Sequence, residues 1–427
     1  MNWTELDKKY VWHPFTQEKT SGPALHVVGA KDARLILEDG KELLDCNSSW
    51  WVNIHGHGNE TIRKAMNEQF AKIDHIIFAG ATHKAAIQLA KTVAELLPND
   101  LEKVFFSDNG STAVEVALKM VIQYWYNKNV PRKKILAMEG AYHGDTFGAM
   151  SAGQRGYFNE PFEDYFFDVD FIPFPEQDEK AVLEMAFEKL QTKEYAAVIV
   201  EPLVQGSAGM RMYSESFLDQ FVQYAKSSNT LVVFDEVMTA WGRTGKLFAM
   251  NHCKEHPDIV CLSKGLTGGV LPLGLTVATR TIYDAFYSDD KRKALLHGHS
   301  FTGNAIACSV ANASIQLLLK EKTVKSIERI SRLNEKFKKK LEKKFPTVKV
   351  RTLGTILALE MDTEENGYFA SMRDKAYDFF IENGLLIRPL GNVIFVNPPF
   401  CLTDLEYAKI EKVILMFLEL NRKPNIN

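Results

Sequence analysis

The stretch that decides the fold of this chain covers residues 258–269 and reads DIVCLSKGLTGG. Four apolar residues deliver a single lysine, Lys264, to a turn rich in Gly, Ser and Thr. Upstream, residues 230–236, TLVVFDE, form another apolar run that ends on the carboxylates of Asp235 and Glu236. Two buried strands that end on an amine and a carboxylate, with a crossover between them, indicate a parallel sheet that binds a ligand at its mouth.

This pair of groups suits pyridoxal phosphate. Lysine can form a Schiff base with a carbonyl carbon, and a carboxylate can keep the ring nitrogen protonated. Taken singly, each residue has a plainer explanation, with Lys264 as a solvated surface lysine and Asp235 as a helix cap. The pair gains weight from the phosphate and ring sites found elsewhere in the chain.

The bulk composition narrows the class of protein. A chain of 427 residues favours a large domain plus a smaller one, and 46% hydrophobic with 25% charged residues is ordinary for a globular protein. A net charge of −3 gives no reason to expect nucleic acid or an anionic membrane as a partner. The N-terminus lacks the apolar region of a secretory signal, and no apolar run approaches a membrane span of ~20 residues. The five scattered cysteines fit free thiols in a reducing cytoplasm.

The predicted organisation is an α/β fold with a mostly parallel central sheet. Strand-like runs alternate with helical ones between residues 60 and 322, which we expect to form the large domain. Residues 323–427 begin with a long amphipathic helix from Thr323 to about Phe345 and continue as a smaller α+β domain. Residues 1–59, with a hairpin turning at Asp39-Gly40, are expected to join that small domain. The expected strands cover 103–107, 134–138, 196–200, 231–234, 259–262, 274–278, 348–351, 356–361, 385–388 and 393–396.

Two further strand ends carry a candidate phosphate site and a candidate ring contact. Residues 108–112, DNGST, open a helix, where Gly110 and Ser111 offer free N–H groups and a hydroxyl to a phosphate. A simple helix cap is the alternative. Tyr142, in the run EGAYHGDT at 139–146, can lie flat over a planar ring, or it can plug a turn. Val237, two residues past Asp235, would face the other side of such a ring.

The outer part of the site is less sharply defined. Arg388 ends an expected strand and can grip a carboxylate with two hydrogen bonds, although a surface salt bridge is an equal alternative. Trp50 and Trp51 either pack in the core or wall an elongated substrate. Residues 242–247, GRTGKL, resemble a phosphate-binding loop but lack its spacing and its Ser or Thr. The scattered residues His252, Cys253, His256 and Cys261 fit no zinc spacing, so we expect no metal site.

Together these segments resemble the class III, fold-type I family of pyridoxal-phosphate aminotransferases over essentially the whole chain. Within that family, several segments are similar to the branch that acts in biotin synthesis. They are VWHPFTQ (11–17), SSWW (48–51), IHG (54–56), YHGDTFGAMS (142–151), EPLVQG (201–206), GMRMY (209–213), GRTGKLFA (242–249) and IRP (387–389).

The resemblance implies roles for individual residues. Lys264 matches the Schiff-base lysine and Asp235 the partner of the pyridine nitrogen. The phosphate loop matches Gly110 and Ser111, and the ring-stacking aromatic matches Tyr142. In such enzymes a Ser or Thr of the second subunit also reaches the phosphate, a place that Ser300 occupies here. This match implies a homodimer with composite active sites. The substrate contacts match Trp50, Tyr142, Asp145, Gly298 and Arg388.

The resemblance also implies a reaction. We expect ping-pong transamination of 8-amino-7-oxononanoate to 7,8-diaminononanoate, with S-adenosylmethionine as the amino donor. One residue departs from the family pattern. Family members that use S-adenosylmethionine often have Tyr at the position of Phe15. Lysine as donor therefore stays open, as does another class III activity on an ω-amino acid or diamine. A non-catalytic cofactor-binding scaffold or regulator is the alternative from another class, and the intact Lys264 and Asp235 oppose it.

Overall fold

The computed structural model describes residues 2–98, 100–130, 132–176, 178–362 and 372–422. Its main feature is a seven-stranded sheet with the strand order β4-β12-β11-β10-β7-β5-β6. The neighbouring strands β11, β10, β7, β5 and β6 all run parallel to one another. The strand β12 runs antiparallel to both of its neighbours, β4 and β11. The strands are β4 (Leu101–Ser107), β5 (Lys134–Met138), β6 (Val169–Ile172), β7 (Tyr195–Val200), β10 (Leu231–Asp235), β11 (Ile259–Leu262) and β12 (Gly274–Thr279).

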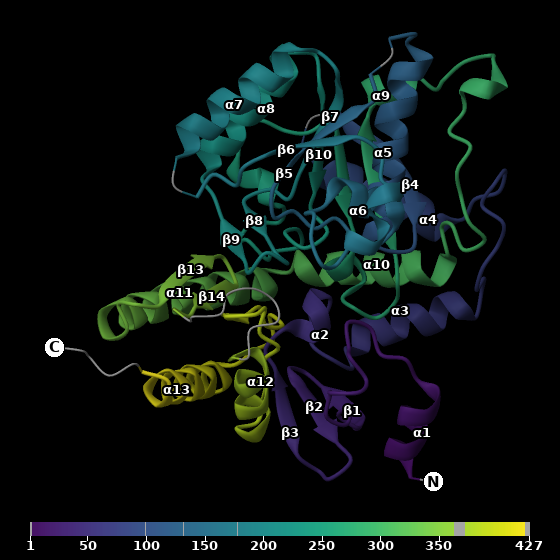
Figure 1. Ribbon diagram of the computed structural model, residues 1–427. Helices are drawn as coiled ribbons and strands as arrows, with labels where there is room; N and C mark the ends of the chain where they lie inside the picture. Colours follow the sequence, from purple (N-terminus) through teal and green to yellow (C-terminus); the bar gives the residue numbers. More distant parts are fainter. Residues whose placement is uncertain (1, 99, 131, 177, 363–371, 423–427) are drawn as a thin grey trace.

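Helices cover both faces of this sheet (Figure 1). One face packs on α5 (Gly110–Asn127), α6 (Phe147–Ala152) and α9 (Arg280–Asp284). The other packs on α4 (Lys84–Leu96), α7 (Glu179–Gln191), α8 (Glu215–Ser227) and α10 (Ala305–Leu318), with α3 (Glu60–Phe70) against α10. Alternate residues of β5 enter the two cores, Ile135 one and Leu136 the other. Burial on both faces explains why these strands read as unbroken apolar runs in the sequence.

Two smaller sheets lie beside the large one. One has the order β1-β2-β3-β15, with β1 (Val27–Lys31), β2 (Arg34–Leu37), β3 (Glu42–Asp45) and β15 (Leu385–Leu386). The other has the order β13-β14-β16, with β13 (Lys349–Leu353), β14 (Ile356–Glu360) and β16 (Val393–Val396). Around them lie α1 (Trp3–Tyr10), α11 (Glu321–Lys344), α12 (Met372–Glu382) and α13 (Asp404–Leu420) (Figure 1). The first sheet therefore joins strands from both ends of the chain.

Most predicted elements are present. The hairpin at Asp39-Gly40 is formed by β2 and β3, and the long helix is α11. The edge strand β6 was not predicted. The prediction that a strand runs to Arg388 is wrong, because β15 ends at Leu386. The Arg388 N–H donates to the Asn47 side chain instead of to a strand, and Pro389 has no N–H to continue the pairing.

Across the described ranges, no helix combines the length and apolar character needed to cross a membrane.

Candidate active site

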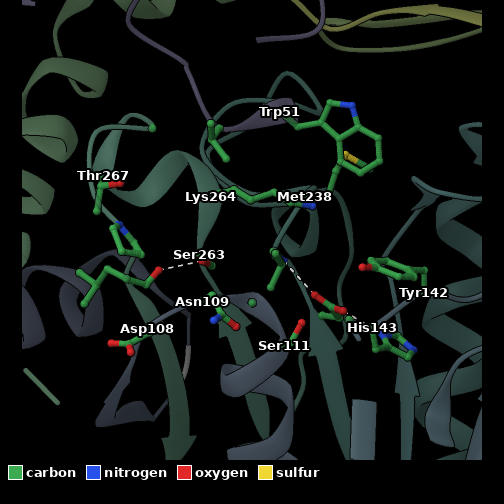
Figure 2. A pocket seen from close by; sticks show the side chains of 18 of the residues that line it. Trp51, Asp108, Asn109, Ser111, Tyr142, His143, Met238, Ser263, Lys264 and Thr267 are labelled. Atoms are coloured by element: carbon green, nitrogen blue, oxygen red, sulfur yellow. Dashed lines mark hydrogen bonds and ion pairs between the residues drawn. The ribbon is translucent and has the colours of Figure 1, made fainter. Parts of the chain in front are cut away.

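A cavity of about 380 Å³ lies at the edge of the large sheet where the parallel strands end. The loops that follow β4, β5, β7, β10 and β11 all contribute residues to it, and its walls also include Trp51, Ser207 and residues 269–273. Figure 2 shows Lys264 extending across this cavity below Trp51, with Ser111, Tyr142 and His143 on other walls. The structure therefore brings together six of the predicted site residues: Gly110, Ser111, Tyr142, Asp235, Val237 and Lys264.

Lys264 is presented by a strained turn. It directly follows β11 and Ser263, and it begins the short 3-10 helix η3 (Lys264–Thr267) with a φ of 45°, which is unfavourable for a residue with a side chain. Its Nζ lies 4.5 Å from the centroid of the Trp51 ring. Burial lowers the pKa of Lys264 to about 8, although Asp235 and Glu201 pull it upward. The neutral, nucleophilic amine is therefore more readily formed near pH 7 than in an ordinary lysine.

Asp235 is the buried last residue of β10, and its carboxylate is held on both oxygens. Oδ1 accepts a hydrogen bond of 3.0 Å from the Val237 N–H, and Oδ2 lies 2.8 Å from His143 Nδ1. His143 is buried too, and its Nε2 has no partner among the described residues. Since a carboxylate oxygen accepts hydrogen bonds, His143 donates from Nδ1 and fixes the orientation of the Asp235 side chain. Sequence reasoning assigned no role to His143, although the motif containing it was noted.

The start of α5 forms a crowded cradle. Asn109 caps the helix by accepting the Thr112 N–H at 3.0 Å, which leaves the first N–H groups without helical partners. A Cβ on Gly144 would lie 2.1 Å from Ser111 Oγ, and one on Gly110 would lie 2.6 Å from Val237 Cγ1. Only glycine fits at either position. Backbone N–H groups and the Ser111 hydroxyl can therefore approach an anion closely.

Tyr142 is fixed at both ends. Its N–H donates to Glu201 Oε1 at 3.0 Å, and its hydroxyl donates to Asp145 Oδ2 at 2.9 Å. Glu201, just after β7, also accepts the Gly206 N–H at 2.9 Å. Burial raises the pKa of Glu201 to about 7, with His143 opposing the shift. Glu201 is a second pocket residue to which the sequence gave no role, since its only signal was the motif around it.

Apart from Tyr142, the predicted substrate contacts lie outside this cavity. Residues 48–51 all have positive φ, so the two tryptophans sit on a left-handed turn, α2 (Ser48–Trp51), which sends Trp51 into the cavity and leaves Trp50 45% exposed. The Arg388 guanidinium lies 5.3 Å from the Trp50 ring, and Phe15 meets that ring edge-on at 5.5 Å. Phe15, Trp50 and Arg388 thus form one aromatic and cationic cluster, termed here the rim.

Gly298 and Ser300 lie in the exposed loop before α10 and do not line the cavity of their own chain. The Ser300 carbonyl accepts a hydrogen bond of 2.6 Å from His75 Nε2. Asp145 is also exposed, with its carboxylate turned to Tyr142.

The other sequence motifs have structural partners. His252 Nε2 meets the Thr244 carbonyl at 3.0 Å, and the five cysteines are free. Within the ranges that the structure describes, no three His, Cys, Asp or Glu residues gather in a way that could hold a metal ion.

Comparison with known proteins assigns the family. The family model described as "Aminotransferase class-III" matches residues 16–417. The chain belongs to this family. A curated adenosylmethionine-8-amino-7-oxononanoate aminotransferase from Synechococcus elongatus is 46% identical over 96% of this chain and 98% of its own length. The relative of the same name from Staphylococcus aureus is 35% identical, with 97% of each chain covered.

Solved structures agree with this assignment. The crystal structure of adenosylmethionine-8-amino-7-oxononanoate aminotransferase from Methanocaldococcus jannaschii is similar to this class-III aminotransferase with a TM-score of 0.93. The identity is 33%, with 98% of this chain and 99% of the other covered. An (S)-enantioselective omega-transaminase from Thermomicrobium roseum follows with a TM-score of 0.90 and 26% identity over 98% of each chain. The expected fold class is confirmed, and the protein is a pyridoxal-phosphate-dependent aminotransferase.

Proposed function

We propose that this aminotransferase converts 8-amino-7-oxononanoate to 7,8-diaminononanoate in biotin synthesis, with S-adenosylmethionine as the amino donor. The observation that carries the proposal is the 46% identity, over nearly the full length, to a relative named for that donor and acceptor. The pocket supports the chemistry, because it offers an amine of lowered pKa opposite a buried, hydrogen-bonded carboxylate.

The residues present fit pyridoxal phosphate. The start of α5 and Ser111 would hold the phosphate, as the crowding at Gly110 and Gly144 allows a close backbone approach. Tyr142 and Val237 would flank the ring, Asp235 would meet the ring nitrogen, and Lys264 would hold the cofactor through Nζ. When bound, the cofactor supplies an electron sink that stabilises the charge left when the donor loses a proton from its α carbon.

The protein groups then have distinct tasks. Lys264 Nζ moves the proton between carbon atoms, a task suited to an amine whose pKa of about 8 lies near the working pH. Asp235 would keep a proton on the ring nitrogen of the bound cofactor, and the hydrogen bond from His143 Nδ1 orients the Asp235 carboxylate for this task. Trp51 covers Lys264 and limits the access of water. Arg388 would bind the acceptor's carboxylate, since its guanidinium forms no ion pair with any described residue.

We further propose a cytoplasmic homodimer in which Gly298 and Ser300 complete the partner's site. Both residues lie outside the cavity of their own chain, on an exposed loop that also carries Phe301, with 61% of that side chain accessible. Five free cysteines suit a reducing compartment. We also keep the sequence-based boundaries as a proposal, with residues 60–322 as the large domain and residues 1–59 and 323–427 as the smaller one.

Phe15 favours lysine as a second candidate donor. Its ring packs against Trp50 and, at 6.0 Å, against Phe158, and it offers no hydroxyl to a polar donor. The test is to supply 8-amino-7-oxononanoate with each donor separately and to compare the specificity constants for diaminononanoate formation. S-adenosylmethionine should give the larger value. If lysine supports turnover and S-adenosylmethionine does not, the donor assignment is wrong. If the acceptor is not converted with any donor, the proposed function is wrong.

A further inference from the structure

The turn at residues 206–210 touches the active site on one side. It joins the short strands β8 (Val204–Gln205) and β9 (Arg211–Met212). The Gly206 N–H donates to Glu201 Oε2 at 2.9 Å, and Ser207 lines the cavity. A Cβ on Gly206 would lie only 3.2 Å from Cζ3 of Trp51, the residue that covers Lys264. The position of this turn therefore sets the position of several groups in the pocket.

On its other side the same turn is held by the small sheet that contains β13. Arg351 on β13 donates from Nε to the Met210 carbonyl at 3.1 Å and from Nη2 to the Gly209 carbonyl at 2.8 Å. Its Nη1 donates to Glu360 Oε2 on the neighbouring strand β14 at 2.5 Å, which fixes the guanidinium. β9 lies close to β13 in Figure 1, in agreement with these contacts.

The backbone of the turn needs such support. Gly209 has a φ of +85° and Met210 a φ of 53°, which is unfavourable for a residue with a side chain. A Cβ on Gly209 would also lie 3.0 Å from Val393 Cγ2 on β16, so the small sheet packs directly on the turn. Such a conformation persists only where the surroundings hold it, and here the held atoms are the two carbonyls that Arg351 binds.

We infer that Arg351 is a positioning residue for the transamination. By holding the Gly209 and Met210 carbonyls, it fixes the turn 206–210. This turn places Ser207 in the pocket and aims the Gly206 N–H at Glu201. Through Arg351, the position of the small sheet thereby determines the position of the pocket groups around Lys264. This inference rests on the proposed function of the pocket and adds a residue that lies outside it.

Glu201 gives the inference a measurable signature. The groups that face it are His143, Asp235, Lys264, Tyr142 and Tyr213, and its two backbone donors are the N–H groups of Tyr142 and Gly206. Its pKa is already raised to about 7 by burial. Loss of the Gly206 donor would remove a hydrogen bond to the charged form, so the pKa would rise further. Any pH transition that reports Glu201 should then move upward.

The experiment compares Arg351→Met with Arg329→Met in the cofactor-loaded enzyme. Arg329 is a matched control, because it also joins one carboxylate, that of Asp404, and one carbonyl, that of Leu402, away from the pocket. Hydrogen exchange of the peptide covering residues 203–213 should rise at least tenfold in Arg351→Met alone. The pH titration of the cofactor absorbance and of a single half-reaction should shift upward by about one unit in this variant alone.

Exchange and titration curves that match the control would overturn the inference, even if turnover falls. If Arg351→Met does not fold, Gly209→Ala disturbs the same turn with Arg351 intact, and it should give the same rise in exchange and the same upward shift. An unchanged titration in Gly209→Ala would then overturn the inference. Arg351→Lys, which can reach one carbonyl, should recover part of both effects. If the wild type transfers no amino group, the proposed function is wrong. The role of Arg351 in holding the turn is still tested in that case, because hydrogen exchange does not depend on activity.

Discussion

The pocket around Lys264 and the rim around Trp50 differ in how firmly the chain fixes them. In the pocket, Asp235, His143 and Glu201 are buried, and each has a hydrogen-bond partner from another loop. In the rim, Trp50 and Phe15 are exposed by 45% and 41% and are held by ring contacts. The comparison teaches that one chain fixes the buried groups to which we assign the proton chemistry. The rim groups, to which we assign substrate recognition, are held by ring contacts and, as we propose, are completed by the second subunit.

The sharpest way to break this comparison is to remove the amine from the pocket. Lys264→Ala should lower turnover by about 100- to 10,000-fold, because no other amine lies in the cavity to move the proton. Added methylamine should recover part of the rate in a stopped-flow half-reaction. Lys246→Ala, at an exposed turn outside the cavity, is the control and should behave as the wild type. Comparable losses in both variants would remove Lys264 from this task.

The next largest effect is expected at Asp235. Asp235→Asn should keep the cofactor but lower half-reaction rates by about 10- to 150-fold, as a charge-assisted hydrogen bond of ~1.5–3 kcal/mol is lost. Asp258→Asn is a matched control, since Asp258 accepts the Val232 N–H at 2.8 Å at the opposite end of the same strands. It should lower the melting temperature with little change in rate. Wild-type rates in Asp235→Asn would contradict the role given to its charge.

The rim should respond more mildly and more selectively. Arg388→Met should raise KM for the acceptor about tenfold through the lost pairing with a carboxylate, while KM for the donor in the other half-reaction changes little. Steady-state kinetics with both substrates varied would measure this. Arg388→Lys should recover only part of the loss, because a lysine ammonium cannot form the two parallel hydrogen bonds that a guanidinium forms with a carboxylate. An equal change in both KM values would show that Arg388 acts on the structure of the rim rather than on the acceptor.

The smallest effect is expected at Phe15. Phe15→Tyr should favour S-adenosylmethionine over lysine by about 2- to 13-fold, the value of one added hydrogen bond of ~0.5–1.5 kcal/mol. The specificity constants for the two donors provide the measurement. An unchanged ratio would mean that position 15 does not select the donor.

The same contrast explains what the sequence could predict. Lys264, Asp235 and the start of α5 follow from local signals, because each is a polar residue at the end of an apolar run. The pairing of His143 with Asp235 is not local. It depends on the order β10-β7-β5, because the loop after β5 must reach past the end of β7 to meet Asp235 at the end of β10. No periodicity in the chain shows that order.

The tryptophan pair marks a second limit. Four successive positive φ values at residues 48–51 invert the usual helical geometry, so sequence spacing could not tell that Trp51 covers Lys264 while Trp50 faces Arg388. Likewise, the position of Ser300 outside its own cavity follows from the loop before α10, and a match of motifs carries no such information. The edge strand β6 was missed since three of its four residues are only partly buried.

The central claim is that Lys264 is the amine that holds the cofactor. Borohydride fixes the cofactor covalently to whichever amine carries it, and mass mapping of the digested protein then identifies the modified peptide. The account predicts a single modified lysine, Lys264, in the peptide that contains residues 258–269, and no labelling of this peptide in Lys264→Ala. Modification of a different lysine in the wild type, with Lys264 unlabelled, would contradict it.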